Sequence, residues 1–214
     1  MESHSLAVTR TASYYTLGQP AAGAQSLWIV LHGYGQLAPY FLRNFQLLDD
    51  GLHYVVAPEA LSRFYLSGVS GRVGATWMTR ENRLAEIADY GGYLDKLYRE
   101  LQEQAGGSFG RVNVLGFSQG GATACRWLTQ SGLRIDRLIL WAAAFPEDLP
   151  FALTREALRD TEVVLVYGTP DEYATEERIH PQPALLQPQE IPYRLIRFEG
   201  KHVIEEEVLR SLLR

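Results

Sequence analysis

Short runs of hydrophobic residues recur along the chain after residue 25, and small or polar residues close each run. Five runs are almost continuously apolar: Leu27–Leu31, Tyr54–Ala57, Val112–Phe117, Leu138–Trp141 and Val163–Tyr167. Runs of this kind, without polar alternation, are typical of strands that a parallel sheet buries on both faces. A sixth run, Arg194–Phe198, alternates more and is expected nearer an edge of the sheet.

Helical spacing appears between these runs. Asn82 is a candidate N-cap for a long helix whose apolar face is predicted to be Leu84, Ile87, Ala88, Leu94, Leu97 and Leu101. Glycine in a helix costs about 1 kcal/mol relative to alanine, so Gly91 and Gly92 predict a bend or close packing. Residues Val203–Leu213 are predicted to form a closing helix.

Alternating strands and helices predict an α/β fold, a three-layer α/β/α sandwich with a mostly parallel central sheet. Before the first long strand, Leu6–Arg10 and Tyr14–Leu17 are expected to form an antiparallel pair. The chain of 214 residues contains neither an internal repeat nor a low-complexity tract. We therefore expect a single domain over residues 1–214.

Composition and charge remove several classes of function. A net charge of −5 disfavours a nucleic-acid partner, which requires a basic face. The single cysteine, Cys125, excludes an internal disulfide and a multi-cysteine zinc site, and it is expected to be a small buried hydrophobe. No apolar run approaches the ~20 residues that span a bilayer, and Met1–Thr9 does not resemble a signal peptide. These features predict a cytoplasmic protein without stable membrane insertion.

The most specific motif is Gly116-Phe117-Ser118-Gln119-Gly120, directly after a predicted strand. In a Gly-x-Ser-x-Gly turn the serine occupies a strained strand-to-helix turn, and the glycines relieve the crowding around it. Small residues follow at Gly121–Cys125, and they let the next helix press against the sheet. The pattern predicts that Ser118 is a catalytic nucleophile.

An acyl-transfer enzyme also needs two N–H donors for the developing oxyanion. In this architecture one donor is the backbone N–H after the nucleophile, here Gln119, and the other follows an early strand. The segment Leu31-His32-Gly33-Tyr34-Gly35 occupies that second place, and Tyr34 is the predicted donor. Because His32 precedes the nucleophile in the chain, we expect it to organise the loop rather than to act as the base.

The catalytic acid and base are expected to follow the serine, in that order. His202 comes directly after the last predicted strand, and Asp171 and Glu172 come after the strand before it. Both positions lie at the carboxyl ends of strands, the edge where open α/β sheets place their sites. Asp171 is favoured over its neighbour Glu172 by residue type. Two other candidates are less suitable, because Asp136 precedes a strand and Asp148 follows the strand expected beside the elbow.

Together these pieces resemble the α/β-hydrolase superfamily, and within it the carboxylesterase/phospholipase family that includes acyl-protein thioesterases. The resemblance covers nearly the whole chain and implies a Ser118–His202–Asp171 triad, with Tyr34 and Gln119 as oxyanion donors. It implies an ester or thioester substrate and requires neither a cofactor nor a metal ion. This chain departs from the family pattern beside the acid, where Tyr173 adds aromatic bulk. Nothing in the sequence indicates the oligomeric state.

Substrate preference depends on an aromatic segment between the second long strand and the long helix. Two interpretations fit its large side chains: they pack on the sheet, or they line an acyl pocket. These side chains are Phe64, Tyr65, Leu66, Trp77 and Met78. The resemblance places a tryptophan such as Trp77 near the active site. The leading hypothesis is a carboxylesterase for short to medium acyl groups; the alternatives are a lysophospholipase or acyl-protein thioesterase, and a catalytically silent binding protein.

Overall fold

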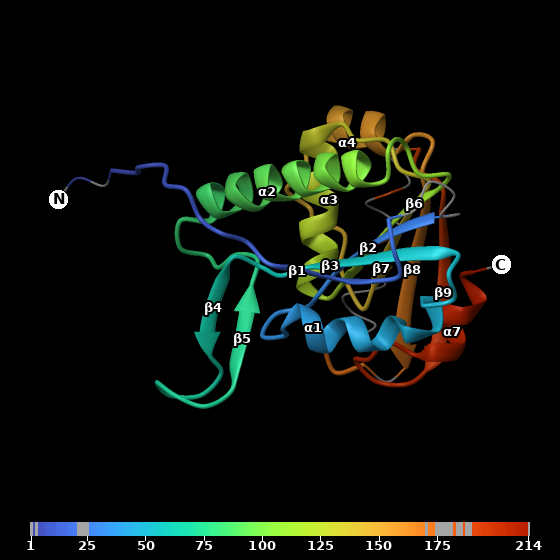
Figure 1. The fold of residues 1–214 in the computed structure, drawn as a ribbon, viewed down its shortest axis with the longest axis horizontal. Helices are drawn as coiled ribbons and strands as arrows, with labels where there is room; N and C mark the ends of the chain where they lie inside the picture. The colour runs from blue at the N-terminus through green and yellow to red at the C-terminus, as the bar shows by residue number, and fades with distance from the viewer. Residues whose placement is uncertain are drawn as a thin grey trace.

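A seven-stranded sheet forms the centre of the molecule, in the order β1-β3-β2-β6-β7-β8-β9 (Figure 1). The computed structural model describes residue 2 and residues 4–20, 26–169, 171–173, 182, 186 and 190–213. The strands are β1 (Tyr14–Leu17), β2 (Ser26–Leu31), β3 (His53–Pro58), β6 (Val112–Phe117), β7 (Arg137–Trp141), β8 (Glu162–Thr169) and β9 (Tyr193–Glu199). From β3 to β9 all neighbours run parallel, and only β1 is antiparallel. The six predicted strands are confirmed, with β9 at an edge as expected.

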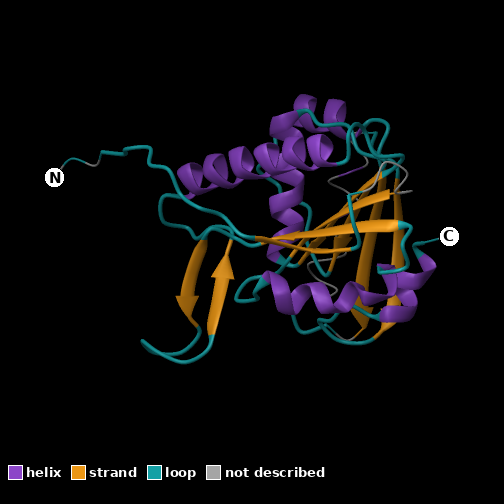
Figure 2. Cartoon of the chain, viewed as in Figure 1, coloured by secondary structure: helices purple, strands orange, loops and turns teal. Residues whose placement is uncertain are grey.

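Helices cover both faces of this sheet (Figures 1 and 2). One layer contains α2 (Arg83–Gln104), α3 (Gln119–Ser131) and α4 (Phe151–Leu158). The other contains α1 (Ala38–Phe41), the 3-10 helix η1 (Leu42–Leu48) and α7 (Glu206–Ser211). Because both faces are covered, β2, β6 and β7 are buried along their whole length. The predicted three-layer α/β sandwich is therefore confirmed. In the part of the chain that the structure describes, no helix has both the length and the apolarity to cross a membrane.

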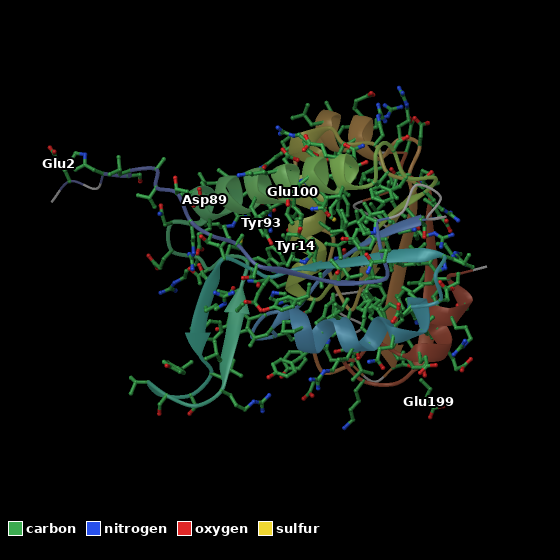
Figure 3. The ribbon with its side chains drawn as sticks, viewed as in Figure 1. Glu2, Tyr14, Asp89, Tyr93, Glu100 and Glu199 are labelled. Carbon is green, nitrogen blue, oxygen red and sulfur yellow. The ribbon has the colours of Figure 1, made fainter. Side chains whose placement is uncertain are left out.

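The predicted N-terminal strand pair is wrong. Residues Leu6–Arg10 form no strand, and β1 pairs with β3 instead, with Tyr14 opposite Pro58. Side chains on α2 help to hold β1 in this place: the Tyr93 hydroxyl donates to the carbonyl of Ser13 at 2.9 Å, and Tyr14 lies beside α2 (Figure 3). The edge of β3 offers unpaired backbone groups to β1, whereas the predicted two-stranded hairpin would be only marginally stable on its own.

Helix α2 begins after Asn82, as predicted, but the predicted cap and part of the predicted apolar face need correction. Asn82 occupies the N-cap position with a φ of 51°, and its side chain makes no capping hydrogen bond. Leu84 is 76% exposed and Ala88 is also exposed, because the first turns of α2 extend past the central sheet (Figure 1). Ile87, Leu94, Leu97 and Leu101 are buried as predicted, together with Tyr90 and Tyr98, which the prediction omitted.

Two further expectations concern small residues and the end of the chain. A Cβ added to Gly91 would lie 3.3 Å from Oε1 of Gln130 on α3, whereas one added to Gly92 would meet nothing within 4 Å, so the predicted close packing is found at Gly91 alone of the two. Cys125 is fully buried in α3, as expected, and burial raises the pKa of its thiol. The closing helix begins at Glu206 rather than Val203, because the Glu205 carboxylate caps the N–H of Val208 at 2.9 Å.

Candidate active site

Ser118 lies on a sharp turn between β6 and α3. Its φ of 53° and ψ of −119° are unusual for a residue with a side chain, and such geometry costs about 1–3 kcal/mol. The surrounding backbone is packed too closely for larger residues. A Cβ on Gly116 would lie 2.4 Å from the carbonyl oxygen of Gly120, and one on Gly120 would lie 2.2 Å from that of Leu31. The glycines of the motif are therefore required by this close approach of β2, β6 and α3.

The loop after β2 leaves one N–H open beside this turn. The N–H of Gly33 donates to Oε1 of Gln36 at 2.8 Å, that of Gly35 to Ala75 at 2.9 Å, and that of Gln36 back to Gly33 at 3.2 Å. Within the described residues the Tyr34 N–H has no acceptor, and it is the predicted oxyanion donor. The loop lies against the elbow, since a Cβ on Gly33 would be 3.2 Å from Cβ of Ser118.

Gln119, the second predicted donor, is the first residue of α3. The first N–H groups of a helix have no acceptor inside the helix, and they lie at the positive end of its dipole. The Gln119 N–H is therefore available to an anion. Its side chain is engaged elsewhere, in hydrogen bonds to the segment that follows β5.

Asp171 and His202 are brought together from the ends of β8 and β9. His202 Nδ1 lies 2.8 Å from Oδ2 of Asp171, whose side chain is completely buried. The other carboxylate oxygen, Oδ1, accepts the N–H of Tyr173 at 2.8 Å, which fixes the orientation of the carboxylate. The adjacent Glu172 is exposed. Of the two candidate acids, the structure places Asp171 against the histidine.

Two aromatic rings hold the imidazole of His202. The ring centroid of Phe117, the residue before the elbow serine, lies 4.7 Å from that of His202, and the centroid of Tyr173 lies 4.9 Å away. Neither ring was given a role from the sequence, in which the position of Tyr173 next to the acid was the available signal. No hydrogen bond joins Ser118 to His202, although the structure describes both residues. Catalytic hydrogen bonds are often long in unliganded enzymes and tighten with substrate.

The side chain of His32 is buried beneath the loop after β2. This loop, residues 32–37, is called the oxyanion loop because it contains Tyr34, the predicted donor. Nε2 of His32 accepts the N–H of Ala60 at 3.1 Å, which puts the ring proton on Nδ1, 2.8 Å from the carbonyl of Gly33. Its backbone carbonyl accepts the indole N–H of Trp77 at 2.9 Å. Burial lowers the pKa of His32, although the hydrogen bond to Gly33 and the charge of Glu59 act in the opposite direction. His32 thus organises the loop, in the role expected from its place in the chain.

The neutral state of His32 predicts acid sensitivity of the fold. Because the pKa of His32 is lower in the folded chain than about 6.5 in the unfolded chain, the unfolded state binds more protons below that pH. Stability is therefore complete above about pH 6.5 and falls below it, by at most about 1.4 kcal/mol per pH unit for this group. Urea unfolding between pH 7.5 and 5.5 should show a shallower dependence in His32→Gln, but not in His4→Gln, which changes an exposed histidine. Equal slopes in His32→Gln and the wild type would contradict this assignment.

The five residues of the predicted acyl pocket divide between core and surface. They belong to or flank a hairpin, β4 (Ser62–Tyr65) and β5 (Val73–Thr76), that projects beside the main sheet (Figure 1). Trp77 is 2% exposed and packs on His32, with ring centroids 5.2 Å apart. Met78 is half-buried. For these two residues the packed interpretation is supported.

Two of the other three pocket candidates, Phe64 and Leu66, lie against the loop after β2. The ring of Phe64 is 5.1 Å from that of Tyr34, and a Cβ on Gly35 would meet Leu66 at 3.1 Å. Tyr65 and Leu66 are 48% and 42% exposed. Leu66 is therefore accessible to a ligand at the loop, whereas Tyr65, next to Phe64 in β4, belongs to the opposite face of the hairpin. A lining role for these side chains remains a prediction.

The two rejected acid candidates have structural partners. Asp136 accepts the N–H of Val112 at 2.7 Å, at the amino end of β6 and away from the elbow. Asp148 pairs with Arg126 at 2.9 Å and with Arg83, joining α2 and α3. Partial burial acts to raise the pKa of Asp148, but hydrogen bonds from Arg126 and Arg83 outweigh it and lower the pKa to about 2. Neither carboxylate contacts His202 among the described residues.

Comparison with known proteins identifies similar structures but no relative by sequence. No protein-family model matches the chain, and no curated protein matches it by sequence. Among solved structures, esterase PE8 is similar at 21% identity, covering 95% of this chain and 96% of its own, with a TM-score of 0.71. A phospholipase/carboxylesterase from Dyadobacter fermentans is 16% identical, with 96% of each chain covered and a TM-score of 0.69.

Acyl-protein thioesterase 2 from Zea mays is 14% identical, with 94% of this chain and 96% of its own covered and a TM-score of 0.71. At such low identities the likeness establishes architecture rather than activity. The chain therefore has the α/β-hydrolase fold, as its resemblance to the carboxylesterase/phospholipase family implied.

Proposed function

We propose that the protein is a serine hydrolase that cleaves carboxylic esters through Ser118, His202 and Asp171. The observation that carries this proposal is the His202–Asp171 pair, held at 2.8 Å on a buried carboxylate and packed against the residue before Ser118. A neutral imidazole oriented in this way is a general base, and a serine on a strained turn is presented for attack. The resemblance of the fold to esterases supports the same reaction class.

The proposed reaction has two steps. His202 takes the Ser118 proton as the hydroxyl oxygen attacks the ester carbonyl, and the N–H groups of Tyr34 and Gln119 stabilise the oxyanion. Collapse of the tetrahedral intermediate breaks the ester bond, and the imidazolium gives its proton to the leaving alcohol. Water then attacks the acyl-enzyme, again through His202, and releases the carboxylic acid. Asp171 accepts the Nδ1–H of His202 and stabilises the imidazolium.

The proposed substrates are esters with short to medium acyl groups. Longer acyl groups, in a lysophospholipid or an acylated protein, are the second candidate, and the exposed Leu66 beside Gly35 favours it. The names of the phospholipase/carboxylesterase and the acyl-protein thioesterase among the similar structures agree with this range. The remaining alternative is an inactive hydrolase fold that binds a ligand.

A panel of substrates tests these possibilities. It consists of acetyl, butyryl, octanoyl and palmitoyl esters of one chromogenic alcohol, a lysophosphatidylcholine and a palmitoyl thioester peptide. The proposal predicts the highest kcat/KM among the short and medium esters. A maximum for the lysolipid or the thioester would select the second candidate. No turnover of any substrate and no labelling by a fluorophosphonate would favour the binding protein.

A further inference from the structure

The segment Gly74–Met78, which ends the β4–β5 hairpin, is hydrogen-bonded both to the loop that carries the Tyr34 N–H and to the side chain of Gln119. On one side it holds the loop after β2. The N–H of Gly35 donates to the carbonyl of Ala75 at 2.9 Å, and the N–H of Ala75 donates to Gln36 at 3.1 Å. The indole of Trp77 adds a third bond, to the carbonyl of His32 at 2.9 Å. Tyr34 is thus flanked on both sides by residues that this segment fixes.

On its other side the segment is held by the carboxamide of Gln119. Oε1 accepts the N–H of Trp77 at 3.1 Å, and Nε2 donates to the carbonyl of Met78 at 2.8 Å. The hydroxyl of Thr76 lies 3.0 Å from Nε2 and also donates to Met78 at 2.9 Å. Both ends of the carboxamide are therefore used, and each of its contacts is with residues 76–78.

Packing leaves this connection little freedom. Thr76 and Trp77 are 3% and 2% exposed, and Ala75 is fully buried. A Cβ on Gly74 would lie 2.4 Å from the carbonyl oxygen of Gly35, so the two backbones are in direct contact. Buried hydrogen bonds between close-packed backbones resist small displacements more than exposed ones do.

We propose that the Gln119 carboxamide is a positioning group for the oxyanion hole. Through residues 74–78 it ties the first turn of α3, which carries the Gln119 N–H, to the loop that carries the Tyr34 N–H. These two donors lie far apart in the chain, and their spacing must be held to about 0.5 Å to stabilise a tetrahedral oxyanion. The inference rests on the proposed serine hydrolase activity, and it assigns the side chain of Gln119 a role separate from that of its backbone.

The test replaces Gln119 by methionine, which preserves the length of the side chain and removes its hydrogen bonds. Loss of one whole oxyanion donor costs about 10²–10³ in kcat, so a misaligned pair should cost about tenfold to a hundredfold. Because the defect belongs to the transition state, KM should stay within about twofold of the wild type. Affinity for an alkyl boronic acid, which binds as a tetrahedral adduct, should fall in parallel with kcat/KM.

Two variants accompany this one. Gln130→Met makes the same change at an exposed position on the same helix and should leave kcat, KM and boronate affinity unchanged. Thr76→Val keeps the branched shape and removes the hydroxyl between Gln119 and Met78, and it should lower kcat several-fold. It also provides an independent test if circular dichroism shows that Gln119→Met does not fold.

The outcomes separate this inference from the proposed function. An active wild type, with folded Gln119→Met and Thr76→Val variants at wild-type kcat, would overturn the positioning role and leave the hydrolase intact. A rise in KM at unchanged kcat would overturn it as well, because that result indicates substrate binding. A wild type that neither turns over esters nor reacts with a fluorophosphonate would refute the hydrolase proposal, and the positioning role with it.

Discussion

Replacing Ser118 by alanine is expected to lower kcat by about 10⁶-fold, because the acyl-enzyme can no longer form. The elbow would keep its backbone, since alanine differs from serine only by the hydroxyl. Among the described residues that hydroxyl has no hydrogen bond to His202, so its removal should leave the fold unchanged. Residual turnover would come from direct attack of water on the bound ester, with the oxyanion still stabilised by the Tyr34 and Gln119 N–H groups. The measurement is steady-state hydrolysis of the best ester in the panel.

Covalent labelling makes the same prediction independently of any substrate. A fluorophosphonate should add one phosphonyl group to the wild-type chain, on Ser118, and none to Ser118→Ala. Ser131→Ala, at the far end of the same helix, is the matched control and should label at the wild-type rate. Retention of most of the activity in a folded Ser118→Ala variant, with the label on another residue, would remove Ser118 as the nucleophile.

The parts of this fold that were predictable share one physical cause. Strands buried on both faces must be apolar at successive positions, so β2, β3, β6, β7 and β8 could be located from continuous apolar runs in the sequence. Parallel strands present their carboxyl ends at one edge, and this geometry predicts that Ser118, Asp171 and His202 lie at the same edge of the sheet.

The features that sequence analysis missed depend on partners distant in the chain. The β4–β5 hairpin was expected only as an aromatic loop, because its position is set by bonds to the oxyanion loop and to Gln119. β1 pairs with β3 rather than with its sequence neighbour for the same reason. Leu84 has the correct helical spacing for burial, yet its side chain is 76% exposed, while Ile87 in the next turn is buried. Spacing predicts a face, whereas burial also requires a neighbour.

The contrast between two adjacent carboxylates is the second large expected effect. Asp171→Asn should lower kcat by up to about 10⁴-fold, and Glu172→Gln should leave it near the wild-type value. In the wild type Oδ2 of Asp171 accepts a hydrogen bond from Nδ1–H of His202 at 2.8 Å. This tautomer leaves Nε2 unprotonated and able to take the Ser118 proton. An asparagine at this position can present its N–H₂ group to Nδ1, which would shift the ring proton to Nε2 and block the base.

The paired measurement isolates this effect from a general loss of charge. Both substitutions remove one negative charge from the same turn, but only Asp171 is buried against His202, whereas Glu172 is exposed to water that screens its charge. A general loss of negative charge from this turn would impair both variants, whereas loss of the buried hydrogen bond to His202 impairs only Asp171→Asn. If Glu172→Gln were the impaired variant and Asp171→Asn nearly silent, the acid would be Glu172, and the loop at residues 171–173 would have to rearrange when substrate binds.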